Sequence, residues 1–233
     1  PPPPLPLHEA GGRTLASDIH SGQSLPPFDN SAMDGFALRA NGATFEAGTE
    51  FAVQGWQAAG DAGAEGGEGA WEIMTGARMP SGLDTVVPVE NVDILASEEG
   101  RPTRIALKAS VKPGQHVRLR GQDVSEGERV LQAGQVLDIN ARTLLHAIGV
   151  GQVVVVARPK AAVIATGKEL VTEAAQTLES GQIRDSNRPY LVGRLQAGGA
   201  EVVWQGTVGD DVAAFNAVLD EALAAGAQVL IST

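Results

Sequence analysis

A run of short polar side chains near the start of the chain is the first candidate for chemistry. The segment LPPFDNSAMDGFALRA (25–40) contains Asp29, Asn30, Ser31 and Asp34. Asp, Asn and Ser side chains bond to nearby backbone groups, so a tight turn explains the first three. A turn does not also require an aspartate that is followed by a glycine, which lets the backbone approach a ligand closely. Because a carboxylate can bind a divalent cation or orient a polar group, Asp34 is our first candidate site residue.

Two later segments carry the next candidates. IMTGARMP places Thr75 after an expected strand, where a turn is the ordinary interpretation. HVRLRGQDVSEG places Arg118 and Arg120 two residues apart, hence on one face of a strand, and Asp123 follows them. Two such arginines are either solvated at an edge or form a bidentate clamp for phosphate. The residues alone leave both interpretations open.

The elements that position these side chains begin with β structure. Residues 40–136 form short runs of β-forming residues between Gly, Pro, Asn and Asp, which predicts an all-β module, a small barrel or a sandwich. Within it, the glycine-rich run at 60–71 is typical of a flexible hairpin tip. Before it, Leu15 and Ile19 are spaced as on a helix, which predicts a short helical element within residues 7–21.

From residue 137 onward the pattern indicates α/β structure. A helix with Asp138 or Asn140 as its N-cap ends at Gly149. After a first strand, the run KAAVIAT (160–166) is apolar throughout, as in a parallel strand that is covered on both faces. Such a strand needs helices on either side of its sheet.

Strands and helices then alternate to the end of the sequence. A helix begins at Ser186 or Asn187 and ends at Gly198, a strand covers residues 202–206, a helix follows Asp211, and AQVLIST forms a third strand. This order predicts an open doubly wound sheet that is incomplete at its C-terminal end.

Ligands bind to such sheets beyond the carboxyl ends of the strands. The loops at 166–169 and 208–211 fall there, and they carry Glu169 and Asp210. The neighbouring Asp211 has an ordinary explanation, because it lies where a helix N-cap belongs. Glu169 and Asp210 are therefore the candidate site residues at the carboxyl edge of this sheet.

The composition limits the function classes. The 233 residues include no cysteine, which excludes a disulfide framework, a cysteine-ligated zinc site and a thiol nucleophile, and fits a cytoplasmic protein. A net charge of −11 argues against a general nucleic-acid binder, because phosphate binding needs a basic surface. No apolar run reaches the roughly 20 residues that cross a bilayer, so no membrane partner is expected.

Six segments in order resemble the molybdopterin molybdenumtransferases, the family of MoeA and the gephyrin E domain. They are LPPFDNSAMDGFAL, IMTGARMPSGLDTVVPVE, VRLRGQDVSEGERVLQAGQVL, AVIATGKELV, GQIRDSNRPYL and VGDD. The likeness extends from about residue 5 to residue 233, and FDNSAMDG is specific. It implies an enzyme of molybdenum cofactor biosynthesis that inserts molybdate into adenylylated molybdopterin and releases AMP.

The resemblance also implies an organisation and partners. The chain would contain a discontinuous N-terminal domain (1–39 and 137–157), a β-rich insertion domain (40–136) and the first part of a molybdopterin-binding α/β domain (158–233). The family implies a cytoplasmic homodimer, Mg²⁺ at the phosphates, and a molybdopterin adenylyltransferase as the upstream partner. Because the family continues beyond the last strand of this sequence, we expect the chain alone to be inactive.

Site residues follow from the matched motifs. The catalytic positions implied by resemblance are Asp34, Thr75, Asp123, Glu169 and Asp210, the first three from one protomer and the last two from the other. The implied cofactor-binding positions are Thr166, Gly167, Ser186, Asn187, Arg118 and Arg120. The implied metal ligands are Asp34, Glu169 and Asp210, since carboxylates near anionic substrates need a bridging cation.

The chain departs from the family pattern at two positions. Lys168 stands where an aspartate is common, and Gln122 stands where a glutamate is common. Lys168 either pairs with phosphate or lowers cation affinity, and the sequence does not decide between these effects. The alternative function within the resemblance is a molybdopterin-binding scaffold or regulator of the gephyrin type, without turnover.

Overall fold

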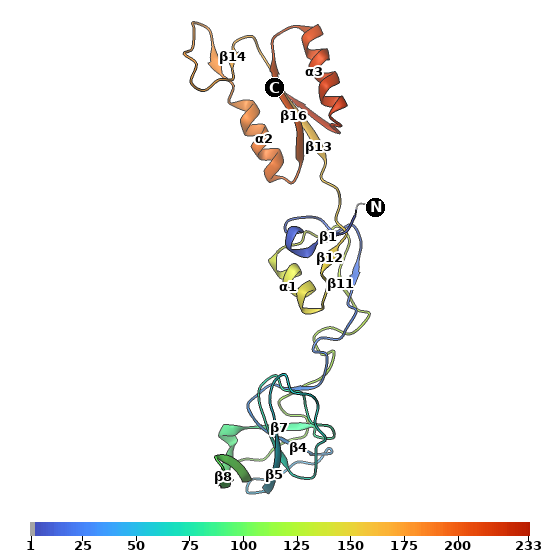
Figure 1. Cartoon of the computed structure of the whole chain (residues 1–233), viewed down its shortest axis with the longest axis vertical. Coiled ribbons are helices and arrows are strands. Elements are labelled where there is room, and N and C mark those ends of the chain that lie inside the picture. The colour runs from blue at the N-terminus through green and yellow to red at the C-terminus, as the bar shows by residue number, and fades with distance from the viewer. Residues whose placement is uncertain (1–2) are drawn as a thin grey trace. The chain divides into compact units, whose positions relative to one another are not determined.

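The chain folds into two compact units in a computed structural model that describes residues 3–233 (Figure 1). The first two residues of the predicted N-terminal domain lie outside the described part. The β unit comprises residues 18–133 and 140–151. The α/β unit comprises the residues up to 17, residues 134–139 and residues 152–233.

A six-stranded mixed sheet forms the β unit. In spatial order its strands are β7 (Thr85–Pro88), β4 (Gly35–Leu38), β6 (Ala70–Ile73), β5 (Glu50–Gln57), β9 (Arg101–Leu107) and β8 (Val92–Glu98). Only β5 and β6 run parallel. A 3₁₀ turn, η2 (Val89–Asn91), joins β7 to β8. The predicted β-rich module is confirmed, and its sheet includes β4, which precedes residue 40. The division into three domains stays a prediction.

Strand β4 lies between β6 and β7 and is buried on both faces. Phe36 and Leu38 pack in one apolar cluster with Ile105, and Ala37 packs in a second cluster with Ile73. Each large side chain buried in this way contributes about 1.5–3 kcal/mol of transfer free energy. Asp34, directly before β4, is therefore attached to a strand that is buried along its whole length.

Two short strand pairs form separate sheets in the same unit. β3 (Asn30–Ser31) pairs antiparallel with β10 (Val117–Arg118), and β2 (Ile19–His20) pairs antiparallel with β11 (Arg129–Leu131). On its other side, the segment of β3 bonds to the chain around residue 77, where the Ser31 N–H donates to the Ala77 carbonyl at 3.0 Å. The DNS tripeptide is thus extended and flanked by backbone on both sides.

Gly35 is required by the close approach of two strands. A Cβ at this position would lie 1.9 Å from the Val87 carbonyl oxygen, a backbone atom of the neighbouring β7. No real Cβ contact is that short, so any side chain would push the strands apart. Gly35 therefore allows the backbone to approach β7, a strand of the same sheet.

The glycine-rich run at 60–71 is not a hairpin tip, because the strands that it connects, β5 and β6, run parallel. Ser81 donates its N–H to the Ala64 carbonyl at 2.8 Å, and the Gly66 N–H donates to the Ser81 carbonyl at 3.0 Å. A Cβ at Gly67 would lie 2.1 Å from Oε1 of Gln54. Glycine is common in linkers, and in this run it also permits close packing against the neighbouring chain.

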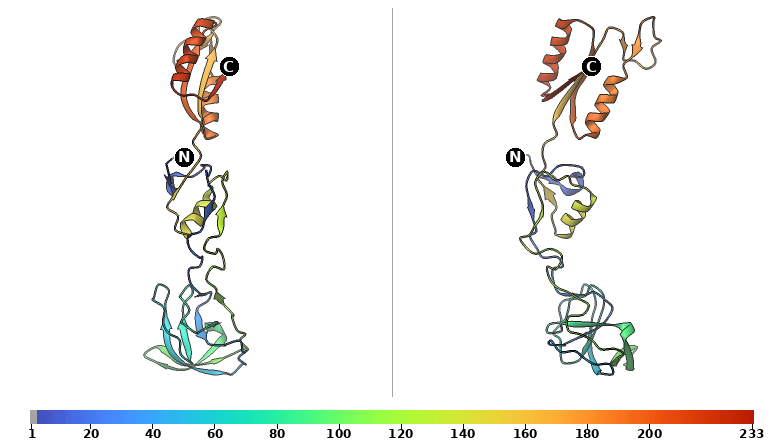
Figure 2. Two further views of the ribbon diagram at one scale, coloured as in Figure 1. Left: turned by 90° about the vertical axis from the view of Figure 1, so that its right-hand side faces the viewer. Right: turned by 180° about the vertical axis from the view of Figure 1, so that it is seen from behind.

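A parallel three-stranded sheet forms the core of the α/β unit (Figure 2). β13 (Lys160–Thr166) lies between β16 (Glu201–Val208) and β17 (Val229–Ser232). Helices α2 (Asn187–Ala197) and α3 (Val212–Ala224) flank the strands on opposite sides (Figure 1). β14 (Leu170–Val171) and β15 (Ile183–Arg184) form a separate parallel pair. The predicted open doubly wound sheet and its apolar central strand are confirmed.

The remaining part of the α/β unit corrects one expectation. The helical element predicted within residues 7–21 is limited to one 3₁₀ turn, η1 (Leu7–Glu9). Leu15 instead forms a bridge with Val155, and Ile19 lies in β2, so both are extended. Two apolar residues four apart fit an extended chain as well, because both point to the same side of it. Nearby, β1 (Leu5–Pro6) pairs with β12 (Gln152–Val153).

Helix α1 (Ile139–Ala147) was predicted closely. It begins directly after Asp138 and is followed by Gly149, which adopts a left-handed conformation with φ of 78°. Among residues 3–233, no helix combines the length and the apolar character needed to cross a membrane.

The role of Gly35 predicts a large effect of a small substitution. Gly35→Ala should destabilise the β unit by about 3 kcal/mol, because the methyl group meets fixed backbone of β7. Thermal unfolding of the purified chain measures the change. Gly22→Ala is the matched control, since a Cβ there meets no atom within 4 Å. Equal melting temperatures for the two variants would contradict this account of Gly35.

Candidate functional site

Asp34 and Thr75 lie side by side on the surface of the β unit. The Thr75 N–H donates to Oδ1 of Asp34 at 2.6 Å, and the Thr75 hydroxyl donates to the same oxygen at 2.9 Å. The backbone bond first, and the hydroxyl bond second, lower the pKa of Asp34 below its ordinary range, because both favour the ionised form. Within residues 3–233, Oδ2 of Asp34 has no hydrogen-bond partner. It is available to a ligand.

Backbone hydrogen bonds fix this pair from both sides. The Gly76 N–H donates to the Ser31 carbonyl at 2.8 Å, and the Val89 N–H donates to the Asp34 carbonyl at 3.0 Å. The loop that carries Thr75 is therefore bound to the segment that carries Asp34, although the two residues are far apart in sequence. Their motifs had predicted them separately, and the structure brings them into contact.

Asp123 is exposed and has a cation beside it. The guanidinium of Arg118 donates to Oδ2 of Asp123. Gln122, one of the two departures from the family pattern, accepts the Leu119 N–H through Oε1 at 3.0 Å, and this bond stabilises the turn before Asp123. A glutamate oxygen can accept the same bond, so the turn does not distinguish the two residue types.

The expected strand alternation of Arg118 and Arg120 is wrong. β10 ends at Arg118, and the chain then turns at Gly121, which has a φ of 74°. Nη2 of Arg120 lies 3.4 Å from Oε2 of Glu126, while Arg118 binds Asp123. Because each guanidinium has a different carboxylate partner, the structure provides no ready-made clamp of two arginines.

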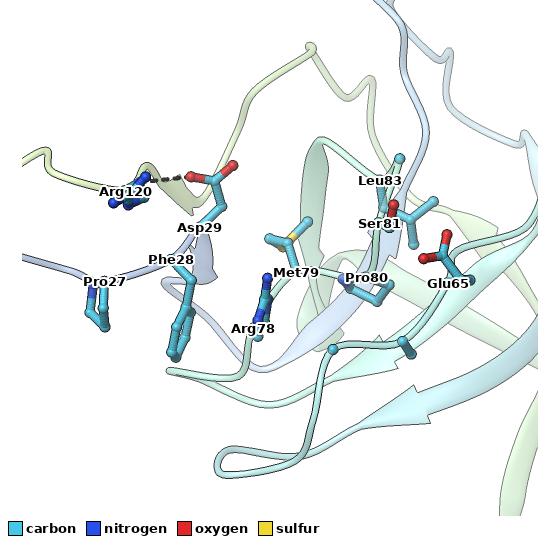
Figure 3. Close-up of a pocket in the computed structure, with 13 residues that line it drawn as sticks. Pro27, Phe28, Asp29, Glu65, Arg78, Met79, Pro80, Ser81, Leu83 and Arg120 are labelled. Carbon is cyan, nitrogen blue, oxygen red and sulfur yellow. Dashed lines mark hydrogen bonds between the residues drawn. The ribbon is translucent and has the colours of Figure 1, made fainter. Parts of the chain in front are cut away.

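A cavity of about 680 Å³ lies beside this region of the β unit (Figure 3). Phe28, Asp29 and Arg120 form one wall. The backbone N–H of Arg120 donates to Oδ1 of Asp29 at 2.7 Å. The guanidinium of Arg78 lies 5.7 Å from the centre of the Phe28 ring. Glu65, from the glycine-rich run at 60–71, lies on the opposite wall. This volume suits a small organic molecule, and of the predicted site residues only Arg120 lines it.

In the α/β unit, several predicted residues meet at the carboxyl end of β13. The Thr166 hydroxyl donates to the Thr233 carbonyl at 3.0 Å, and Nδ2 of Asn187 donates to the Thr233 hydroxyl at 3.1 Å. The Gly167 N–H donates to the Val208 carbonyl at 3.0 Å. The structure thus assembles the ends of all three parallel strands and the start of α2 at one edge.

Glu169 folds back over the glycine that precedes it by two residues. A Cβ on Gly167 would lie 2.6 Å from Oε1 of Glu169, and Gly167 has a φ of 147°, which favours glycine. Lys168 between them is exposed. The carboxylate of Glu169 therefore occupies the space that any side chain at position 167 would need.

The remaining predicted residues of this edge differ in how they are held. Asp210 is exposed, whereas Asp211 accepts the N–H groups of Ala213 and Ala214 and caps α3 as predicted. Ser186 precedes α2, but its side chain makes no capping bond. That bond belongs to Asp185.

Asp185 is a functional candidate that the sequence reasoning missed. Its side chain is only 1% exposed, and it accepts the N–H of Arg188 at 3.0 Å and the Thr207 hydroxyl at 3.0 Å. Asp often accepts an N–H of the first helical turn from a residue two or three positions further along the chain. Arg188 lies three positions after Asp185, and this spacing was the signal in the sequence that could have identified Asp185.

No metal cage is formed within one chain. Across residues 3–233, no three His, Asp or Glu side chains lie close enough to hold a metal ion, so Asp34, Glu169 and Asp210 do not form such a group. Asp34 belongs to the β unit, and Glu169 and Asp210 belong to the α/β unit. Single carboxylates fit Mg²⁺ only when substrate phosphates and water supply its other ligands.

Comparisons with known proteins match both units. The family model described as "MoeA N-terminal region (domain I and II)" matches residues 1–149, and the model described as "Probable molybdopterin binding domain" matches residues 162–233. The molybdopterin molybdenumtransferase 2 of Mycobacterium tuberculosis H37Rv is 39% identical over 221 residues, which cover 93% of this chain and 53% of the relative. The molybdopterin molybdenumtransferase of Synechococcus elongatus is 37% identical, with 98% and 57% covered.

A solved structure agrees with the sequence relatives. A molybdopterin biosynthesis moeA protein from Pyrococcus horikoshii OT3 superimposes with a TM-score of 0.85 at 33% identity, covering 99% of this chain and 60% of that protein. The chain thus spans about half the length of the curated relatives that it matches.

The two bonds from Thr75 predict a change in the titration of Asp34. In Thr75→Val the hydroxyl bond is lost and the backbone bond remains, so the pKa of Asp34 should rise but stay below its ordinary value. NMR titration of the Asp34 carboxyl carbon measures it. Thr44→Val, at an exposed threonine of the same unit, should leave the pKa unchanged. An unaltered titration in Thr75→Val would show that the hydroxyl does not bind Asp34.

Gly167 predicts a second local effect. Gly167→Ala should destabilise the α/β unit by about 1–3 kcal/mol and displace the Glu169 carboxylate, because the methyl group requires both its space and an unfavourable φ. Thermal unfolding and the carboxyl chemical shift of Glu169 report the two effects. Gly209→Ala is the control, since a Cβ there meets no atom within 4 Å. The prediction fails if both substitutions leave Glu169 in place.

Proposed function

Because this chain belongs to the MoeA family, we propose that the protein inserts molybdate into adenylylated molybdopterin in molybdenum cofactor biosynthesis. Water cleaves the phosphoanhydride, AMP leaves, and the dithiolene receives molybdenum. The proposal makes the protein a transferase, as the names of its relatives M. tuberculosis molybdopterin molybdenumtransferase 2 and S. elongatus molybdopterin molybdenumtransferase describe those proteins.

The observation that carries the proposal is the ionised carboxylate of Asp34. Two donors from Thr75 use Oδ1 and lower the pKa, so Asp34 is an anion at neutral pH with Oδ2 available. A carboxylate in that state stays ionised, so it can orient an attacking water by accepting its hydrogen bond, or bind a cation. Its place directly before β4 holds the oxygen in one position, as the orientation of a reacting water requires.

The α/β unit supports the other half of the proposal. Thr166, Gly167 and Asn187 lie at the carboxyl edge of the parallel sheet, where such sheets bind their ligands. We expect this edge to hold the molybdopterin, with Glu169 and Asp210 as its acidic groups. Ser186, Arg118 and Arg120 remain proposed contacts to the anionic parts of the substrate.

Three partners complete the proposal. A magnesium ion, when bound through Asp34, Glu169 or Asp210, would offset the negative charge of the phosphates. The protein would act in the cytoplasm as a homodimer, with Asp34, Thr75 and Asp123 from one protomer and Glu169 and Asp210 from the other. A molybdopterin adenylyltransferase would supply the substrate.

Substitution of the carboxylates tests the function. Asp34→Ala and Glu169→Ala, made in the protein at its natural length, should each lower the rate of AMP release by at least about 100-fold, because the loss of a group that orients the reacting atoms costs that much. The assay contains adenylylated molybdopterin, molybdate and magnesium, and it measures both AMP and active cofactor. Asp220→Asn, at an exposed position of α3, is the control and should keep the wild-type rate.

Two results would redirect the proposal. Undiminished turnover in Asp34→Ala or Glu169→Ala would remove that residue from the mechanism. Tight binding of adenylylated molybdopterin by the wild-type protein without any release of AMP would favour a scaffold of the gephyrin type.

A further inference from the structure

Asp185 lies at the junction of the loops that form the carboxyl edge of the α/β unit. Oδ1 accepts the Arg188 N–H at 3.0 Å, and Oδ2 accepts Nε of Arg188 at 2.9 Å and the Thr207 hydroxyl at 3.0 Å. With three donors and a side chain only 1% exposed, this carboxylate is the most enclosed ion pair partner of the described residues.

The energetics favour a charged group in this position. Burial alone would raise the pKa of Asp185, but the Arg188 N–H and guanidinium and the Thr207 hydroxyl outweigh burial and lower the pKa below its ordinary value. Asp185 is therefore ionised at neutral pH. A buried carboxylate that loses one of its donors becomes costly, so its partners are held in place.

One side of the junction leads to Glu169. The Asp185 N–H donates to the Val171 carbonyl at 3.0 Å, and the Ile183 N–H donates to the Glu169 carbonyl at 2.9 Å. These bonds belong to the parallel pair of β14 and β15. The backbone on either side of Glu169 is thus tied to the chain that ends at Asp185.

The other side of the junction leads to Asp210. Thr207 is the second-to-last residue of β16, and the loop with Asp210 follows within three residues. The Thr207 hydroxyl is the direct side-chain link between this strand end and Asp185. A third connection, to Ser186 and Asn187, is the chain itself, because α2 begins directly after Asp185 and Ser186.

We propose that Asp185 is a positioning residue, which fixes the Glu169 loop and the Asp210 loop relative to each other and so aligns the two acidic groups. The inference rests on the proposed function for the roles of Glu169 and Asp210. Asp185 itself is enclosed by Arg188 and Thr207, so it acts through these neighbours and not by touching the substrate.

Hydrogen exchange on this chain tests the coupling without any turnover. The Gly167 N–H, which bonds to Val208, and the Ile183 N–H, which bonds to Glu169, report on the two loops. In Asp185→Asn both amides should exchange at least about tenfold faster, as local opening becomes easier, while Val163 in the centre of β13 keeps its protection. Asp220→Asn should change none of the three.

Steady-state kinetics of the protein at its natural length test the effect on the reaction. Asp185→Asn should lower kcat by about 10- to 100-fold, because misalignment of reacting groups is costly, and leave KM within about threefold. Thr207→Val removes only the link to β16 and should reproduce the effect in part, whereas Thr207→Ser keeps the hydroxyl and should retain wild-type kcat. The Thr207 variants decide the question if Asp185→Asn does not fold.

Three outcomes separate the possibilities. Unchanged exchange of Gly167 and Ile183 in Asp185→Asn and Thr207→Val would overturn the coupling of the loops. Faster exchange with wild-type kcat in both variants would overturn the positioning role. If the wild-type protein releases no AMP, the proposed function fails, and the exchange of Gly167 and Ile183 still decides whether Asp185 couples the two loops.

Discussion

The β unit depends on the backbone pairing of the segment that contains the DNS tripeptide. This segment bonds to the chain around Ala77 on one side and to β10 on the other. The pairing leads through a short bend at 32–34 into β4, which is buried along its whole length, so Asp34 lies in a bend that is held by a strand at each end. The same pairing brings Arg118 beside Asp123 and Arg120 beside Asp29. One run of polar residues thus organises the Asp34–Thr75 pair, the Arg118–Asp123 ion pair and one wall of the cavity.

Much of the fold could be predicted from local pattern. The apolar run of β13, the helix that follows Asp211 and the glycine after α1 are all features of a few adjacent residues, and the structure confirms them. The family resemblance was equally visible, because its motifs are short and ordered. What could not be predicted depends on residues that are distant in sequence. The contact of Thr75 with Asp34 and the link of Thr207 to Asp185 are of this kind.

The errors have related physical causes. The spacing of Leu15 and Ile19 fits a helix and an extended chain equally, and only long-range bridges decide between them. The alternation of Arg118 and Arg120 assumed a strand that a left-handed glycine ends. The start of α2 at Ser186 and Asn187 was predicted correctly, but the bond to the first helical turn comes from the buried neighbour Asp185. In each case the local preference was real and a tertiary contact determined the outcome.

The glycine-rich run, which contributes residues 63–65 to the cavity, limits how this surface can vary. A Cβ at Gly66 would lie 2.7 Å from the Ser81 carbonyl oxygen, and one at Gly69 would lie 2.4 Å from the Ala52 carbonyl oxygen. A side chain at Gly66 or Gly69 would displace the neighbouring backbone before it changed the shape of the cavity. Gly60, by contrast, borders open space. An engineer who wishes to reshape the cavity should therefore change the length of the loop near its start and leave its later glycines as they are.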